Sequence, residues 1–380
     1  MTTLAAPIQA RRSPDLATAS AGHLPTLDGV RGVAILLILG HHLLAPIGSL
    51  RFRATFVDSL WIGVDLFFVL SGFLITRILL AARDKPRCFR NFYLRRALRI
   101  FPLYYAFLAA LGLAAWLSPA AIDHEGAITR SLPWVAGYAT NIFIALRAEF
   151  LTPLLNPLWS LAIEEHFYLL WPLLIFLLPR RALIAACIGL IVAPLLLRLA
   201  FASSLPSGTL HTLTPFRIDT LAAGSLVAVL MERGPWPAWA AKLLAAILTL
   251  TLLLLGLIWI RGGGLQWNNS IMQPGLYSIL AIFFAALLAA MLQPGLAPEA
   301  GRLLSHPVLR FFGTYSYSLY LVNVPALILA GLIVDATPLA ETRIGPMARS
   351  LLGLGLAVAL AMATWHLLEK HCLRLKSRFT

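Results

Sequence analysis

The feature that most constrains the fold of this chain is a series of apolar runs, each long enough to cross a lipid bilayer. The first run, LDGVRGVAILLILGHHLLAPIG, covers residues 27 to 48. A helix of about 20 apolar residues spans the roughly 30 Å of a hydrocarbon core. Because 59% of the residues are hydrophobic and only 12% are charged, the sequence predicts an all-α polytopic membrane protein and excludes an ordinary soluble domain.

Ten such runs predict about ten transmembrane helices. They lie at about 27–48, 60–81, 100–117, 158–178, 181–201, 215–231, 241–260, 272–292, 311–334 and 347–368. A further apolar stretch, 132–146, is short and contains Gly137 and Asn141. We expect a re-entrant segment there, because Arg180 and Arg181 then fall in the cytoplasm as the positive-inside rule prefers. A true crossing is the alternative.

Basic residues between the runs set the topology. The segment ARDKPRCFRNFYLRRALRI carries seven arginines and lysines against one aspartate. It is therefore predicted to be cytoplasmic, together with both termini. We expect a disordered cytoplasmic tail over residues 1–25, a transmembrane domain over 26–370 and a basic cytoplasmic tail over 371–380.

The net charge of +14 is explained by these loops. Because the basic residues lie mainly between apolar runs, we expect contact with the lipid bilayer and no nucleic-acid binding. Cys88, Cys187 and Cys372 lack the spacing of metal ligands, so we expect free thiols and no metal site.

Arg31 and His42 are costly residues for a membrane helix and are therefore candidates for function. Eleven residues make three helical turns plus about 20°, so the two side chains share one face and stand about 16 Å apart. They could contact two ends of an elongated ligand. An arginine reaching the interface and a histidine that packs between helices are the structural alternative. Asp28 lies on the face of Arg31, where it can cap the helix.

Two further pairs of charged residues accompany apolar runs. Arg96 and Arg99 lie one turn apart, where guanidinium groups suit phosphates or merely set topology. Glu164 and Glu165 are adjacent in the segment NPLWSLAIEEHFY. Only one of the two can face a cavity wall squarely, and the sequence does not decide which.

Other polar residues could line a site or hold helices together. Asp65 lies inside the second run, and Arg217 and Asp219 belong to the segment FRID. The charges of that segment could pair with each other or line an acceptor site. The hydroxyl-rich segment GTYSYSLY could equally make hydrogen bonds between helices.

Together these segments resemble the acyltransferase-3 family of integral membrane acyltransferases, which includes bacterial O-antigen and exopolysaccharide O-acetylases and macrolide acyltransferases. The matching segments follow in order over about residues 26 to 325: LDGVRG, GVDLFFVLSGFLI, RRALRIFPLYY, NPLWSLAIEEHFYLLWP, FRIDTLAAG and SYSLYL. The resemblance implies transfer of an acyl group, usually acetyl, from cytoplasmic acyl-CoA to a hydroxyl of a cell-surface or exported carbohydrate or glycolipid. It also implies the inner membrane of a bacterium.

The resemblance implies roles for individual residues. His42 would be the catalytic histidine, as a general base or an acylated group, with Arg31 as its partner and Glu164 or Glu165 orienting it or binding sugar. The acetyl-CoA donor would be held by Arg96, Arg99, Ser71, Tyr315 and Tyr317. The acceptor would be met by Asp28, Asp65, Trp159, Ser160, Tyr168, Arg217, Asp219 and Asn323.

The chain departs from the family pattern at three positions. His166 replaces the usual glutamine, Asn323 the usual histidine, and His371 the usual proline. Asn323 keeps hydrogen bonding but cannot exchange protons. Because Arg31 and His42 are intact, we expect an active enzyme.

Two alternatives to this function stay open. Buried arginines and glutamates also line transport pathways, so a transporter or flippase for an anionic amphiphile is one. An acyltransferase that acts on a small secondary metabolite such as a macrolide is the other.

Overall fold

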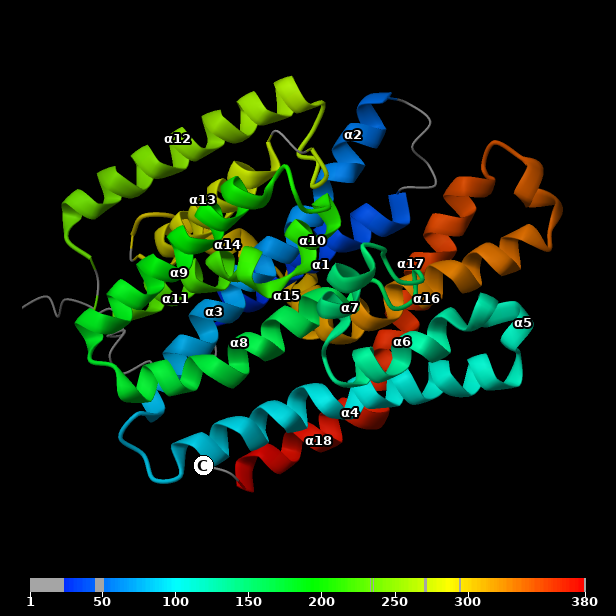
Figure 1. The fold of residues 1–380 in the computed structure, drawn as a ribbon, viewed down its shortest axis with the longest axis horizontal. Coiled ribbons are helices and arrows are strands. Elements are labelled where there is room, and N and C mark those ends of the chain that lie inside the picture. The colour runs from blue at the N-terminus through cyan, green and yellow to red at the C-terminus, as the bar shows by residue number, and fades with distance from the viewer. Residues whose placement is uncertain are drawn as a thin grey trace, which may run out of the picture.

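The structure is a computed structural model that describes residues 24–44, 51–232, 234, 236–269, 272–293 and 295–378. These residues form helices and connecting turns without a strand (Figure 1). The predicted tail over residues 1–25 lies, except for its last two residues, outside the described part of the chain.

Nine helical segments among the described residues are long and apolar enough to cross a membrane. They contain α1 (Pro25–Leu44), α3 (Gly63–Ala82), α4 (Cys88–Leu117), α8 (Leu158–Leu177), α9 (Arg180–Phe201), α12 (Ala238–Gly262), α13 (Gln273–Leu292), α16 (Ser316–Asp335) and α17 (Gly345–Thr364). α2 (Arg51–Ser59) and the short turn η2 (Leu60–Ile62) lead directly into α3. The predicted polytopic helical membrane fold is confirmed.

The run predicted at 215–231 is shorter than a full span. Its helix, α11 (Ile218–Met231), has 14 residues and is therefore about 21 Å long. The residues before it form the short helix α10 (Ser207–Thr212) and the turn η4 (Thr214–Phe216). α11 packs against α3, α9 and α13, and most of its residues are buried in the protein, so the bilayer does not dictate its length.

Close approach of α11 to α3 depends on two glycines. A Cβ atom on Gly72 would overlap the carbonyl of Leu221, and one on Gly224 would overlap the carbonyl of Val69. Small residues at such crossings let membrane helices pack backbone to backbone. This contact fixes the position of the charged residues that α3 and α11 carry.

The segment predicted to be re-entrant is broken in the middle. α6 (Ala127–Ala136) and α7 (Thr140–Arg147) are separated by Tyr138, whose φ of 54° lies in the left-handed region. The ring of Tyr138 stacks on Tyr104 of α4 with centroids 4.3 Å apart. Neither short helix could cross a bilayer alone.

α4 begins well before the predicted start of the third run. It is 30 residues long, or about 45 Å, and it contains both Arg96 and Arg99. The C-terminal part of the chain packs against α4. α17 continues through a π-helical turn, η6 (Trp365–Glu369), into α18 (Lys370–Arg374) and η7 (Leu375–Arg378), which lie alongside α4 (Figure 1).

The remaining short helices, α5 (Pro119–Ile122), α14 (Pro298–Leu304) and α15 (Pro307–Thr314), connect the long ones. α15 packs closely against α1, and α1 also contacts α3, α16 and α17. The helix that carries Arg31 and His42 therefore lies inside the bundle. In contrast, α12 lies at the edge of the bundle (Figure 1), where it can meet lipid.

Candidate active site

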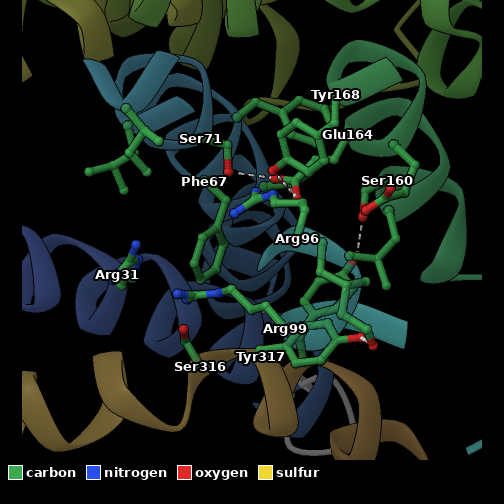
Figure 2. A pocket seen from close by; sticks show the side chains of 18 residues that line it. Arg31, Phe67, Ser71, Arg96, Arg99, Ser160, Glu164, Tyr168, Ser316 and Tyr317 are labelled. Atoms are coloured by element: carbon green, nitrogen blue, oxygen red, sulfur yellow. Dashed lines mark hydrogen bonds between the residues drawn. The ribbon is translucent and has the colours of Figure 1, made fainter. Parts of the chain in front are cut away.

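A pocket of about 150 Å³ opens between α1, α3, α4, α8 and α16 (Figure 2). Apolar side chains, including Phe67, Phe68 and Leu74, form part of its wall. Nine of the residues singled out in the sequence line it: Arg31, Ser71, Arg96, Arg99, Ser160, Glu164, Glu165, Tyr168 and Tyr317. Five helices, from α1 near the start of the chain to α16, thus bring the predicted polar residues together.

Three arginines give one side of the pocket a concentrated positive charge. Figure 2 shows Arg99 extending from α4 toward Arg31 of α1. Arg31 donates a hydrogen bond to Asp28 at 3.2 Å. Arg96 lies over the ring of Tyr168, 4.0 Å from its centroid. Because guanidinium groups bind phosphate bidentately, this arrangement suits an anionic ligand.

The two adjacent glutamates have different surroundings. Both carboxylate oxygens of Glu164 accept hydrogen bonds, one from Ser71 at 2.7 Å and one from Tyr168 at 2.9 Å. Among the described residues, no donor contacts the carboxylate of Glu165, which also lines the pocket. Glu164 is therefore held within a network that joins α3 to α8, whereas Glu165 is available to a ligand.

His42 lies in the last turn of α1 and does not line the pocket. Its Nδ1 is 2.6 Å from Oδ1 of Asn323 on α16. Asn323 follows Tyr320, which lines the pocket, by one helical turn. The Tyr320 hydroxyl lies 2.6 Å from Ser160 Oγ and donates to the carbonyl of Pro157 at 2.7 Å. Of the residues of α16 that line the pocket, Tyr320 is the closest in sequence to Asn323.

The neighbouring His41 points elsewhere. Its Nδ1 is 3.0 Å from the carbonyl oxygen of Val57. Its ring is tilted against that of His42, with centroids 5.3 Å apart. His41 therefore packs against α2.

Three residues predicted for the acceptor form buried ion pairs outside the pocket. Arg217 donates to Asp65 at 2.8 Å, so the pairing of Arg217 with Asp219 considered from sequence does not occur. Asp219 instead accepts from Arg198 of α9 at 2.7 Å. All four side chains are fully buried. The pairs join α3, α9 and α11, and the acceptor role of these residues stays a prediction.

The other predicted residues are also accounted for. Trp159 packs against Phe68 and His211, and Tyr315 packs against Phe311 and Trp365. Neither lines the pocket. Within the described part of the chain, no group of three His, Cys, Asp or Glu side chains could hold a metal ion, and the three cysteines are free.

Sequence reasoning missed two basic residues near these groups. Arg198 lies in the apolar run predicted at 181–201, and a charged residue in such a run could have marked it as a candidate for function. Lys376 belongs to the predicted basic tail, but the tail does not simply extend into solvent: Lys376 lies in η7, which packs against α4. Burial, followed by the charges of Arg99, Arg96, Arg95 and Arg31, lowers the pKa of Lys376 to about 7.

Comparisons with known proteins show the family of this chain. An acyltransferase domain family matches residues 24–366. The peptidoglycan O-acetyltransferase OatA of Listeria monocytogenes is 28% identical over 330 residues, which is 83% of this chain and 51% of OatA. YrhL of Bacillus subtilis, named as a candidate peptidoglycan O-acetyltransferase, is 28% identical over 372 residues, which is 92% of this chain and 54% of YrhL.

The chain spans about half the length of the curated relatives that it matches. No solved structure matches it significantly. The family match covers every long helix of the bundle and all the residues that line the pocket. The chain therefore belongs to the acyltransferase-3 family of integral membrane proteins.

Proposed function

We propose that this chain is an O-acyltransferase that moves an acetyl group from cytoplasmic acetyl-CoA to a hydroxyl of a cell-surface or exported carbohydrate or glycolipid. The observation that carries the proposal is the arrangement along α1, which holds Arg31 in a cationic pocket and His42 eleven residues further along the same helix, in contact with Asn323. The peptidoglycan O-acetyltransferase among the relatives favours a carbohydrate acceptor. The proposed location is the inner membrane of a bacterium, with both termini in the cytoplasm.

The donor would enter with its phosphates toward the arginines. Arg96 and Arg99 have fixed positions on a helix, and with Arg31 they offer donors to several phosphate oxygens. The uncharged pantetheine arm would follow the apolar wall of Phe67 and Phe68. Arg31 and His42 are about 16 Å apart along the helix, which is comparable to the length of an extended pantetheine arm. With the phosphates at the arginines, the thioester at the end of the arm would lie close to His42.

His42 would act as general base. The imidazole takes the proton of the acceptor hydroxyl while the hydroxyl oxygen attacks the thioester carbonyl. The tetrahedral intermediate then expels the CoA thiolate, and the imidazolium returns the proton to that sulfur. Glu165, whose carboxylate has no donor among the described residues, would accept hydrogen bonds from the sugar.

The test uses purified protein in liposomes with acetyl-labelled acetyl-CoA and a peptidoglycan-like acceptor. We expect wild type to label the acceptor and His42→Ala to lose at least about 100-fold in rate, the lower range of general base catalysis. His41→Ala is the matched control, because it removes the adjacent imidazole, and it should keep most of the activity.

A stable His42→Ala protein that still transfers label would refute the role of His42. Label that stays on the wild-type protein would indicate an acyl-enzyme intermediate instead of direct transfer. Movement of an unaltered anionic amphiphile across the liposome, without labelling, would support the transporter alternative.

A further inference from the structure

The hydrogen bond between His42 and Asn323 contains information about where the protons lie. Asn323 is fully buried in α16. Its amide nitrogen donates to the backbone carbonyls of Leu319 at 2.9 Å and Tyr320 at 2.7 Å. Its amide oxygen lies 2.6 Å from His42 Nδ1.

These contacts fix the orientation of the Asn323 amide. A flipped amide would place its oxygen against two carbonyl oxygens, all of which are acceptors only, and would lose two hydrogen bonds. The oxygen must therefore face His42. Because an amide oxygen can only accept, the hydrogen of this bond belongs to Nδ1 of His42.

We propose that Asn323 is a positioning residue that holds neutral His42 in the tautomer protonated at Nδ1. The lone pair then lies on Nε2, which is the nitrogen able to take a proton from a hydroxyl. The inference rests on the proposed role of His42 as general base. It gives the uncharged Asn323 a task that needs no proton exchange, in place of the acceptor contact predicted from sequence.

The residues beside His42 have anchors that do not involve Asn323. His41 packs against one side of His42 and is itself anchored to the Val57 carbonyl. The end of α1 is held separately, because Ser350 of α17 donates a hydrogen bond to the carbonyl of Leu43. The backbone beside His42 thus has its own anchor, which can be removed without touching the imidazole.

The direct test is nitrogen NMR of the full-length protein in bilayers, labelled with ¹⁵N at histidine. The His42 signals are identified by their loss in His42→Gln. We expect Nδ1 to be protonated and Nε2 to be unprotonated near neutral pH. Asn323→Leu should convert this single tautomer into a mixture, whereas Ser350→Ala, the control for loss of an anchor, should leave it unchanged.

Activity gives a second readout. Asn323→Leu should lower kcat by about 10- to 100-fold, less than the roughly 10⁴-fold seen when a catalytic histidine is forced wholly into the wrong tautomer. The KM for acetyl-CoA should not change, since Asn323 does not line the pocket.

A protonated Nε2 in wild type, or an unchanged tautomer in Asn323→Leu, would overturn the inference. The NMR measurement needs no turnover, so it separates this inference from the proposed function. Wild type with the expected tautomer but without any transfer of label would overturn the proposed function and leave the assignment of the proton intact.

Discussion

Replacing Arg217 by Met should destabilise the protein by about 3–5 kcal/mol, because it leaves the carboxylate of Asp65 buried without its partner. Both side chains are fully buried, and the two charged groups are 2.8 Å apart. The guanidinium also lies 3.9 Å from the ring centroid of Tyr277. Arg217→Met keeps much of the side-chain volume, so the predicted loss comes mainly from the charge.

The double variant Asp65→Leu/Arg217→Met should be much more stable than the single Arg217→Met. Replacing both members of a buried pair by apolar residues is often neutral, or stabilising by about 1–4 kcal/mol. This pair is also incompletely satisfied, because Oδ2 of Asp65 and Nε of Arg217 are buried without a partner among the described residues. The two changes should therefore be strongly non-additive.

The assay is unfolding of the purified proteins in one detergent, followed by tryptophan fluorescence for wild type, both single variants and the double variant. The KM for the acceptor is measured on the same preparations. A single Arg217→Met variant with wild-type stability but a raised acceptor KM would refute the structural reading. That result would instead support the prediction that Arg217, in the segment FRID, lines an acceptor site.

Three further predictions concern the pocket, the helix crossing and the C-terminal segment. Arg99→Gln should raise the KM for acetyl-CoA by about 10- to 100-fold through loss of a charge-assisted hydrogen bond, and an unchanged KM would contradict a donor site there. Gly72→Val should lower the yield of folded protein, because a side chain would collide with the Leu221 carbonyl, and thermal unfolding would report it. Since the pKa of Lys376 is lowered to about 7 by burial and then by Arg99, the unfolded state binds more protons between about pH 7 and 10, and stability should rise with pH there. Lys376→Met should flatten that rise in the unfolding temperature, and an identical pH dependence would show that Lys376 is not so perturbed.

The sequence was informative about the fold because membrane helices must be long, apolar and internally hydrogen-bonded. Nine of the ten predicted runs correspond to segments long enough to span a bilayer. The exception, α11, is covered by protein, and hydropathy cannot distinguish burial in protein from burial in lipid. The early start of α4 was missed because arginines near an interface lower hydropathy without ending a helix.

The candidate site was predictable as a set of residues but not as a set of contacts. The structure brings nine of the residues singled out in the sequence into one pocket. The partners of individual charges depend on how helices pack, which the spacing along one helix does not contain. Arg217 therefore pairs with Asp65 across 152 positions of sequence, and His42 meets Asn323 across 281.

If the protein transfers acyl groups between the two sides of the membrane as proposed, the hydrogen bonds of Tyr320 with Ser160 and the Pro157 carbonyl have a consequence for the permeability of the membrane. A protein that receives one substrate from each side of a bilayer contains two openings that approach each other in its interior. If they joined while the protein was empty, protons and water would pass through. By holding α8 to α16 at the wall of the pocket, these hydrogen bonds would act as a seal in the empty protein. Such a seal would have to open for each arriving thioester, and it would allow a cell to keep this protein in an energised membrane without dissipating the proton gradient.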